Sequence, residues 1–300
     1  MSFQEVRELN YNTKRIDKTT GVDLTLYAVP ISTADFEWNT RFTLTYYRDK
    51  TTKRDPSQVL DIQDAPKYTW NDKWIHLSDG LLQPGEVNPG QLETDRRAGE
   101  VKIKDVNGYL RDKMGNKIYD ENGRPMYSNM PDGIIDNADL VMKYNNTPIP
   151  FSWNNNFRWK DFDLGITMYG KFHQWKGNDK KTGANPETLL SGGNTLVYVK
   201  DQYSYDNLDS QVPSFRFWQH GGVGYGDFFV EKAWYIRIDN ITLGYTLPKK
   251  WIRGVLSSVR FYASMKNIAT ITPYKGADPE YDIYLYPSTS SFTFGVDIKF

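Results

Sequence analysis

The sequence contains no cysteine among its 300 residues, which excludes disulfide bonds and thiolate metal sites. It also lacks an excess of charge of either sign, because Lys plus Arg and Asp plus Glu number 37 each. A balanced charge without a long basic run gives no indication of nucleic-acid binding. Histidine is scarce, with three residues, and no nucleophile motif such as Gly-x-Ser-x-Gly lies near them. We therefore predict that the protein is not an enzyme and does not bind nucleic acid.

Long apolar runs are also missing. No stretch of 18 apolar residues occurs and the mean hydropathy is −0.66, which excludes a membrane-spanning helix. The same low average is compatible with a membrane β-barrel, whose strands alternate polar and apolar residues. Residues 1–7 lack a basic segment followed by an apolar core, so we expect any export signal to lie outside this sequence.

Aromatic residues are abundant, at 15% of the chain with 21 Tyr and 9 Trp. The last ten residues, 291–300, alternate strictly, with aromatic or aliphatic residues at every even position from Phe292 to Phe300. Successive side chains of a strand point to opposite faces, so one face of this segment is apolar and the other is polar. Two interpretations fit: an edge strand of a soluble β-sandwich, or the closing strand of an outer-membrane β-barrel.

The same alternation predicts further strands, grouped in hairpins. Pro30 is expected to end the first of them, and Asn155 interrupts the apolar face of the third. In the fifth, the apolar positions change from even to odd at Asp239-Asn240, which predicts a β-bulge or a strand end there. The predicted strands are 22–28, 36–47, 151–159, 162–169, 234–247, 259–269 and 292–300.

The predicted connections alternate in length, and this pattern favours the barrel over the sandwich. Outer-membrane barrels have short periplasmic turns on one side and long extracellular loops on the other. The sequence therefore predicts an all-β fold, an antiparallel portion of a transmembrane β-barrel with about seven strands. The short connections are 32–35, 160–161 and 248–258, and the long ones are 48–150, 170–232 and 270–290.

Several segments carry a resemblance to a known family, in the family's order. They are Gly21-Val-Asp-Leu-Thr-Leu, Asp35-Phe-Glu-Trp-Asn-Thr, Tyr235-Ile-Arg-Ile-Asp-Asn-Ile-Thr-Leu-Gly-Tyr-Thr-Leu-Pro248, Val259-Arg-Phe-Tyr-Ala-Ser-Met-Lys-Asn-Ile268, Tyr274-Lys-Gly-Ala-Asp-Pro-Glu280 and the terminal Phe292-Thr-Phe-Gly295 with Phe300. From about Val22 onward the chain resembles the SusC/RagA family of TonB-linked outer-membrane proteins.

The resemblance implies a 22-strand barrel in the outer membrane of a Gram-negative, Bacteroidota-like bacterium. Such proteins import oligosaccharides or peptides together with a SusD-like surface lipoprotein, and TonB supplies the energy through an N-terminal part. No plug domain is recognisable here and about seven strands cannot close the barrel, so we expect residues 1–300 to be its C-terminal part. Phe300 is then a terminal aromatic signal for the outer-membrane assembly machinery. The alternative is a soluble, calcium-dependent glycan-binding or hydrolytic β-domain.

Two Asp-rich segments resemble the halves of a calcium loop. Joined, they give D-x-N-G-D-G-x-I-D-x-x-D, with oxygen ligands and a turn glycine at the required positions, and SusC-like proteins often carry this motif uninterrupted. Residues 109–131 are then an insertion, expected to form a small hairpin with turns at 115–116 and 122–123. The alternative is a solvated Asx-rich loop without an ion. The candidate calcium ligands are Asp105, Asn107, Asp132, Ile134 through its backbone carbonyl, Asp136 and Asp139.

Loop aromatics are the candidate substrate-binding residues, because sugar rings stack on aromatic faces. The alternative is that they pack the loop against its own barrel mouth. Acid pairs such as Asp278 with Glu280, or Asp161 with Asp163, suggest glycoside hydrolysis only weakly, since chance produces such pairs among 37 acids. The aromatic candidates for substrate or lid contacts are Trp175, Tyr203, Tyr205 and Trp218.

Overall fold

A computed structural model describes most of the chain. The described residues are 16–53, 72–88, 90, 97–121, 123, 125–145, 147–182, 192–219, 226–252, 254–281, 285–286 and 288–300. They divide between two compact units, each described by itself below. One unit comprises residues 1–20, 48–145 and 203–228, and the other comprises 21–47, 146–202 and 229–300.

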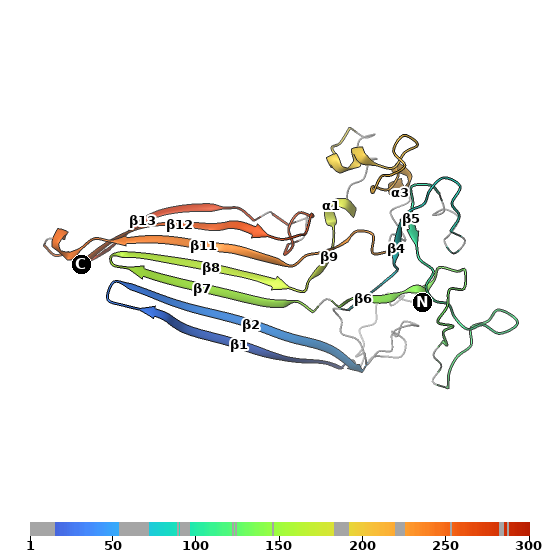
Figure 1. The fold of residues 1–300 in the computed structure, drawn as a ribbon, viewed down its shortest axis with the longest axis horizontal. Helices are drawn as coiled ribbons and strands as arrows, with labels where there is room; N and C mark the ends of the chain where they lie inside the picture. The colour runs from blue at the N-terminus through green and yellow to red at the C-terminus, as the bar shows by residue number, and fades with distance from the viewer. Residues whose placement is uncertain are drawn as a thin grey trace, which may run out of the picture. The chain divides into compact units, whose positions relative to one another are not determined.

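A seven-stranded sheet dominates the second unit, and its strands lie side by side in sequence order (Figure 1). Every strand pairing from β2 to β13 in this sheet is antiparallel. The prediction of about seven strands in an antiparallel all-β fold is therefore confirmed. The strands are β1 (Ile16–Ser32), β2 (Phe36–Lys53), β7 (Ile149–Trp159), β8 (Phe162–Phe172), β11 (Tyr235–Thr246), β12 (Ser258–Ile271) and β13 (Ser291–Lys299).

The short connections all lie at one end of this sheet, where Figure 1 also places the C-terminus. Lys160 and Asp161 join β7 to β8, with Trp159 and Phe162 paired in register. The short connection between β11 and β12 contains one helical turn, the 3₁₀ helix η6 (Lys249–Trp251). Long connections join the strands at the opposite end, as predicted from the sequence.

Several strand limits differ from the predicted ones, and the largest differences are in β1 and β2. Pro30 does not end the first strand, because β1 continues to Ser32. This strand is at the edge of the sheet, and an edge strand accommodates a proline without breaking a ladder. The second strand extends to Lys53 rather than Tyr47. The added segment is polar and has no alternation of apolar residues from which a strand could be predicted.

The long connections contain small elements that the sequence did not predict. Within the described residues, three two-stranded sheets form, in the pairs β3–β6, β4–β5 and β9–β10. No helix in the described part of the chain is long and apolar enough to cross a membrane. The elements are β3 (Asp72–Ile75), β4 (Ser78–Leu81), β5 (Val101–Ile103), η4 (Asn137–Asp139), β6 (Val141–Asn145), β9 (Trp175–Gly177), α1 (Asp179–Thr182), η5 (Val197–Asp201), α3 (Phe215–Gln219) and β10 (Val230–Lys232).

The predicted β-bulge in β11 is confirmed. The register of β11 shifts between Ile238 and Asn240 against both neighbouring strands. Ile238 pairs with Met168 and Ile241 pairs with Ile166, two residues of β8 that point to the same face. The extra residue, Asp239, therefore keeps the apolar side chains before and after it on one side of the sheet.

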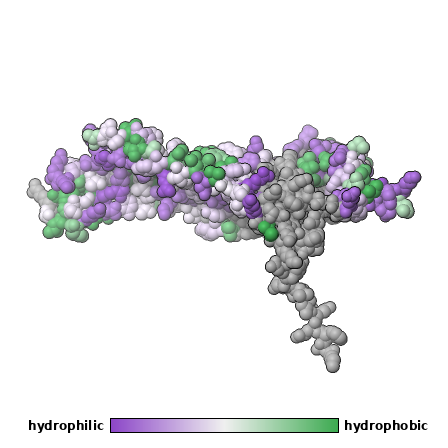
Figure 2. All heavy atoms as spheres, turned by 90° about the horizontal axis from the view of Figure 1, so that it is seen from below, coloured by the Kyte–Doolittle hydropathy of each residue, from purple (hydrophilic) through white to green (hydrophobic). Residues whose placement is uncertain are grey.

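The two units differ in where their apolar residues lie. The first has a buried core that includes Leu82, Val101, Ile103 and Phe217. Many large apolar side chains of the sheet are exposed instead, up to 81% at Phe294, although a few such as Tyr235 and Phe151 are buried. Figure 2 shows hydrophobic patches, in green, at the surface beside hydrophilic residues in purple. An exposed apolar surface of this kind marks a face that contacts lipid or a partner.

Candidate functional site

One face of the seven-stranded sheet is apolar across five adjacent strands. In one row, Phe157 of β7 pairs with Leu164 of β8, which pairs with Leu243 of β11. The row continues through Ala263 of β12 to Phe294 of β13. Rows of paired apolar side chains give a continuous surface because cross-strand neighbours lie within contact distance.

Asn155 is the polar interruption of this face, and the structure explains it. The side chain is 5% exposed, and its Oδ1 accepts a hydrogen bond of 3.1 Å from the indole N–H of Trp38. The indole N–H of Trp153 donates to Thr40 Oγ1 at 2.9 Å. Two tryptophans thus obtain acceptors on an apolar face, where an unpaired N–H group is costly.

The opposite face is polar, and its side chains bond from strand to strand. Hydroxyl, amide and guanidinium groups pair between adjacent strands, and Arg260 of β12 also reaches past β11 to Asp163 of β8. The pairs are Thr43–Ser152 at 2.8 Å, Thr167–Asn154 at 3.0 Å, Thr242–Ser264 at 2.9 Å, Arg260–Asp163 at 2.6 Å and Arg260–Asp297 at 3.0 Å. Paired groups of this kind line a hydrated surface, and the apolar face is the complementary lipid-type surface.

A buried arginine of the polar face holds the loop between β12 and β13. Arg237 is 2% exposed, and its Nη2 donates to both Asp278 carboxylate oxygens at 2.8 and 3.0 Å. Its Nη1 lies 3.3 Å from Glu280 Oε2, and its guanidinium lies 5.6 Å from the ring centroid of Tyr281. Arginine binds strongly when its guanidinium makes charge-assisted hydrogen bonds and also lies against an aromatic ring.

Sequence reasoning missed this anchor. The sequence offers Asp278 and Glu280 only as a weak hydrolytic pair. In the structure both carboxylate oxygens of Asp278 accept from Arg237, and the hydroxyl of Tyr169 donates to Glu280 at 3.1 Å. The signal was the arginine between Ile236 and Ile238. Because side chains alternate along a strand, Arg237 lies on the face opposite to these isoleucines. A buried guanidinium there needs an acidic partner from another part of the chain.

A second cluster joins β10 to the segment that follows β9 and to the loop between β12 and β13. Glu231 of β10 accepts from Lys181 Nζ at 2.9 Å, from Asn178 Nδ2 at 3.0 Å and from the backbone N–H of Lys275 at 2.9 Å. Burial alone would raise the pKa of Glu231, but these donors together hold it below its usual value of 4.5.

This shift predicts a pH dependence. A carboxylate whose pKa is lowered by folding contributes its stabilisation in full above its unfolded pKa and loses it as the pH falls through the folded value. Hydrogen exchange at the β9 and β10 amides is therefore expected to rise below pH 4.5 in the natural chain. The Glu231→Gln variant should lack this rise in hydrogen exchange below pH 4.5. The same dependence of exchange on pH in both proteins would contradict the prediction.

The two Asp-rich segments lie together, with hydrogen bonds between them. Asp105 accepts from the backbone N–H groups of Asp132 at 3.3 Å and Gly133 at 2.6 Å. Asp139, which is fully buried, accepts from Val106 at 2.8 Å and from Asn107 at 3.2 Å. Burial raises the pKa of Asp139, although its backbone donors oppose the shift.

The insertion closes on itself at its base. The N–H of Ser128 donates to Gly108 O at 2.8 Å, and a Cβ on Gly108 would lie 2.5 Å from Asp132 Cβ. Instead of one hairpin, three short segments run side by side, with bridges at Tyr109–Tyr127, Arg111–Lys117 and Tyr119–Pro125. The insertion therefore leaves the two halves of the loop adjacent.

Calcium binding stays a prediction. Among the described residues, no group of three or more His, Asp or Glu side chains is gathered to hold a metal ion. Each of these carboxylates instead accepts backbone N–H groups, as Asp132 does from Ile134 at 3.0 Å and Asp136 from Ala138 at 2.8 Å. A carboxylate has about four lone-pair sites, so acceptance of an N–H group leaves oxygens for an ion.

Added Ca²⁺ is expected to stabilise the natural chain by about 2.7 kcal/mol at a hundredfold excess over Kd. Asp136→Asn should lose this stabilisation, whereas Asp112→Asn, in a turn of the insertion, should keep it. Thermal unfolding with and without a chelator is the measurement. Equal unfolding temperatures with and without saturating Ca²⁺ would contradict the prediction of calcium binding.

The four candidate aromatic residues are not gathered into one site. Trp175 lies in β9, half-buried, with Lys232 Nζ 5.8 Å from its ring centroid. Tyr203 is buried, and its ring lies against Gly99, which belongs to a different long connection but to the same unit as Tyr203. Burial raises the pKa of Tyr203. Tyr205 is 87% exposed and has the geometry of a surface contact. The side chain of Trp218 lies outside the described part of α3.

The fold and the two-faced sheet define a class: antiparallel sheets of the outer-membrane barrel type. Within this class the chain is similar to the SusC/RagA-type TonB-dependent receptors, and the resemblance predicted from the motifs is confirmed. It is 24% identical over 294 residues to "TonB-dependent receptor SusC" of Bacteroides thetaiotaomicron, which covers 93% of the chain and 26% of that protein. It is also 24% identical over 313 residues to "TonB-dependent receptor P3" of Formosa agariphila, with 93% and 28% covered.

Solved structures agree on the fold. The RagAB peptide transporter matches with a TM-score of 0.65 and 20% identity, over 94% of this chain and 29% of that one. The RagAB peptide importer in its closed-closed state matches with a TM-score of 0.66, 18% identity and the same two coverages. No family model matches the sequence. Both curated relatives are named as receptors, neither as an enzyme, and the chain spans about a quarter of their length.

Proposed function

We propose that this chain forms part of the wall of a TonB-dependent outer-membrane transporter. The observation that carries the proposal is the two-faced sheet, apolar and exposed on one side and polar and hydrogen-bonded on the other. The apolar face is assigned to lipid, and the polar face to the interior through which substrate moves. The similarity to TonB-dependent receptors over 93% of the chain supports the same assignment.

The proposed substrates are oligosaccharides or peptides. Amide, hydroxyl and guanidinium groups on the polar face, such as Asn154, Thr242 and Arg260, suit ligands rich in hydroxyl or peptide groups. The structures with this fold are titled as peptide transporters, and SusC is named as a TonB-dependent receptor. We propose a SusD-like surface lipoprotein and TonB as the partners of this chain.

Fractionation and uptake test the proposal together. The chain is expected in the outer-membrane fraction, soluble only with detergent, and an affinity tag on it should recover a surface lipoprotein. Deleting its gene should abolish growth on one class of oligosaccharide or peptide. A monodisperse monomer in detergent-free buffer would favour a soluble, calcium-dependent glycan-binding or hydrolytic domain instead.

We also propose that Phe300 is an assembly signal. The residue is 84% exposed, and its side chain is free of the sheet core. Ser257 Oγ donates to its carbonyl at 3.3 Å, which fixes the end of the chain beside β12. Deleting Phe300 is expected to lower the amount of chain in the outer membrane severalfold, while Val255→Ser in the adjacent turn should not. Normal insertion of the deletion variant would remove this role.

A further inference from the structure

Two apolar grooves adjoin on the outer face of the sheet, near the end that carries the short turns. The larger has a volume of about 880 Å³ and the smaller about 440 Å³. They share Phe162 and Leu243, so these side chains form a ridge between two channels. The larger groove is lined by Phe36, Phe157, Trp159, Phe162, Asp163, Leu164, Ile166 and Leu243.

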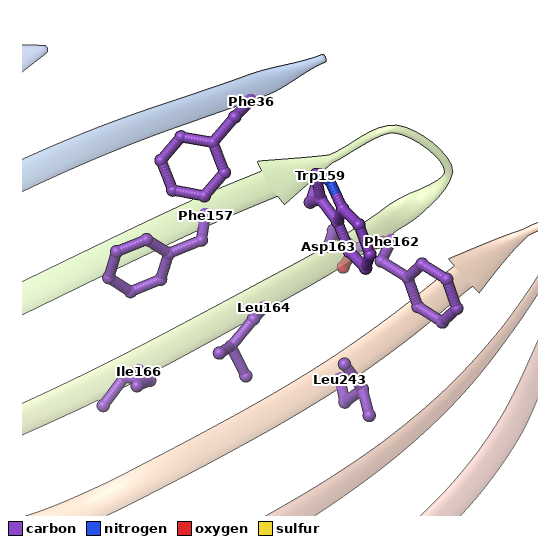
Figure 3. A pocket seen from close by; sticks show the side chains of 8 residues that line it. All are labelled: Phe36, Phe157, Trp159, Phe162, Asp163, Leu164, Ile166 and Leu243. Carbon is purple, nitrogen blue, oxygen red and sulfur yellow. The ribbon is translucent and has the colours of Figure 1, made fainter. Parts of the chain in front are cut away.

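Figure 3 shows how the larger groove is built. Leu164 and Ile166 project from β8 beside Leu243 of β11, and the ring of Phe36 lies beside that of Phe157. At the turn end, the rings of Trp159 and Phe162 stack with centroids 6.1 Å apart. The groove is therefore open along its length and bounded by aromatic rings at one end.

Exposed lysines lie in the turns that follow these rings. Lys160 forms the β7–β8 turn itself, between Trp159 and Phe162, and Lys249 and Lys250 begin the β11–β12 turn. The two turns are joined, because the N–H of Thr246 donates to Asp161 O at 2.9 Å. These turns also carry two acids, Asp35 and Asp161. The third acid of this end, Asp163, lines the groove and is paired with Arg260 at 2.6 Å, so the three lysines leave a surplus of positive charge.

From this arrangement we infer a binding site for one glycerophospholipid, with one acyl chain on each side of the Phe162–Leu243 ridge and the phosphate near Lys160, Lys249 and Lys250. Two adjoining channels fit a lipid with two chains, and the surplus of positive charge at their mouth fits an anionic phosphate. Aromatic rings at the boundary suit the level between chains and headgroups. This inference rests on the proposed function, because it needs the apolar face to be in a membrane.

The test uses the full chain in membranes and two readouts. Lipids brominated along their acyl chains are expected to quench tryptophan fluorescence, because Trp153 and Trp159 are exposed on the apolar face. After extraction in mild detergent, native mass spectrometry should find one retained phospholipid. The double variant Lys249→Ala with Lys250→Ala should weaken its retention roughly tenfold or more. Ala263→Trp, which fills the smaller groove, should have a similar effect, and Lys113→Ala, which removes a distant lysine, should have none.

The outcomes separate the two ideas. Absence of quenching by any brominated lipid would overturn the membrane placement and the inference with it. Quenching with no retained phospholipid, or with retention unchanged in the lysine and groove variants, would overturn the lipid site alone. Cross-linking of two copies through Leu243→Cys, without retained lipid, would assign the grooves to a second copy and likewise reject the lipid.

Discussion

Replacing Arg237 by methionine is expected to loosen the attachment of the loop segment 272–281 to the sheet. The substitution keeps an apolar side chain of similar length but leaves the carboxylates of Asp278 and Glu280 without their cation. Loss of one partner from a buried ion pair costs up to about 3–5 kcal/mol. The two carboxylates, which are about one fifth exposed, then keep only neutral donors, such as the N–H of Glu280 for Asp278 and the hydroxyl of Tyr169 for Glu280. Hydrogen exchange at residues 274–281 should therefore rise by two or more orders of magnitude, and trypsin should cut after Lys275.

Two further variants make this prediction specific. Arg158→Met removes an arginine that pairs with Glu37 at 3.0 Å, but its side chain is 50% exposed, so the expected cost is at most about 1 kcal/mol. Adding Asp278→Asn and Glu280→Gln to Arg237→Met removes the unpaired charges and should restore part of the protection. An effect of Arg237→Met no larger than that of Arg158→Met would show that the loop is held by other contacts.

The anchor also links the polar face to the loops at the end of the sheet. Lys176 of β9 donates to the carbonyls of Asp278 at 3.1 Å and Tyr281 at 2.6 Å. Tyr274 donates through its hydroxyl to Gly177 O at 2.7 Å. The loop 272–281 is therefore held to the seven-stranded sheet by Arg237 and by Tyr169, and to the small β9–β10 sheet by Lys176 and Tyr274. Loss of Arg237 removes only the first of these attachments.

The strands could be predicted because side-chain alternation is a local property of the sequence. The change of phase at Asp239-Asn240 located the bulge, since an apolar face on one side of a sheet permits only one register. The small sheets β3–β6 and β4–β5 escaped prediction because their strands are short and their partners lie far along the chain. Pairing across such distances depends on tertiary contacts that no local pattern reveals.

The site was less predictable than the fold, for a related reason. The Asp-rich halves were found because a cation loop has a fixed spacing of oxygen ligands, and they do lie together. Arg237, Asp278 and Glu280 have no fixed spacing, because they meet only when the loop folds back on the sheet. Asn155 was recorded as an interruption, and its partner Trp38, 117 positions away, became evident only in the folded chain.

A charge on the apolar face is expected to prevent the chain from inserting, while the same charge one residue away is expected to be tolerated. Phe294 and Thr293 are neighbours in β13 with opposite orientations, and in register they face Ala263 and Ser264 of β12. Arginine on the lipid face of a membrane strand costs about 2–4 kcal/mol near the bilayer midplane, whereas substitutions on the inner face cost little. Phe294→Arg should therefore lower the free energy of unfolding in liposomes by that amount and reduce recovery in the outer-membrane fraction.

Thr293→Arg is the matched control, because it places the same guanidinium at nearly the same depth on the polar face. Phe294→Leu is the second control, which removes the ring but keeps the apolar character. Both should insert normally. Equal losses for Phe294→Arg and Thr293→Arg would mean that the face carrying Phe294 does not contact lipid, and the assignment of the two faces would then be wrong. A loss confined to Phe294→Arg would support the membrane placement that the lipid site requires.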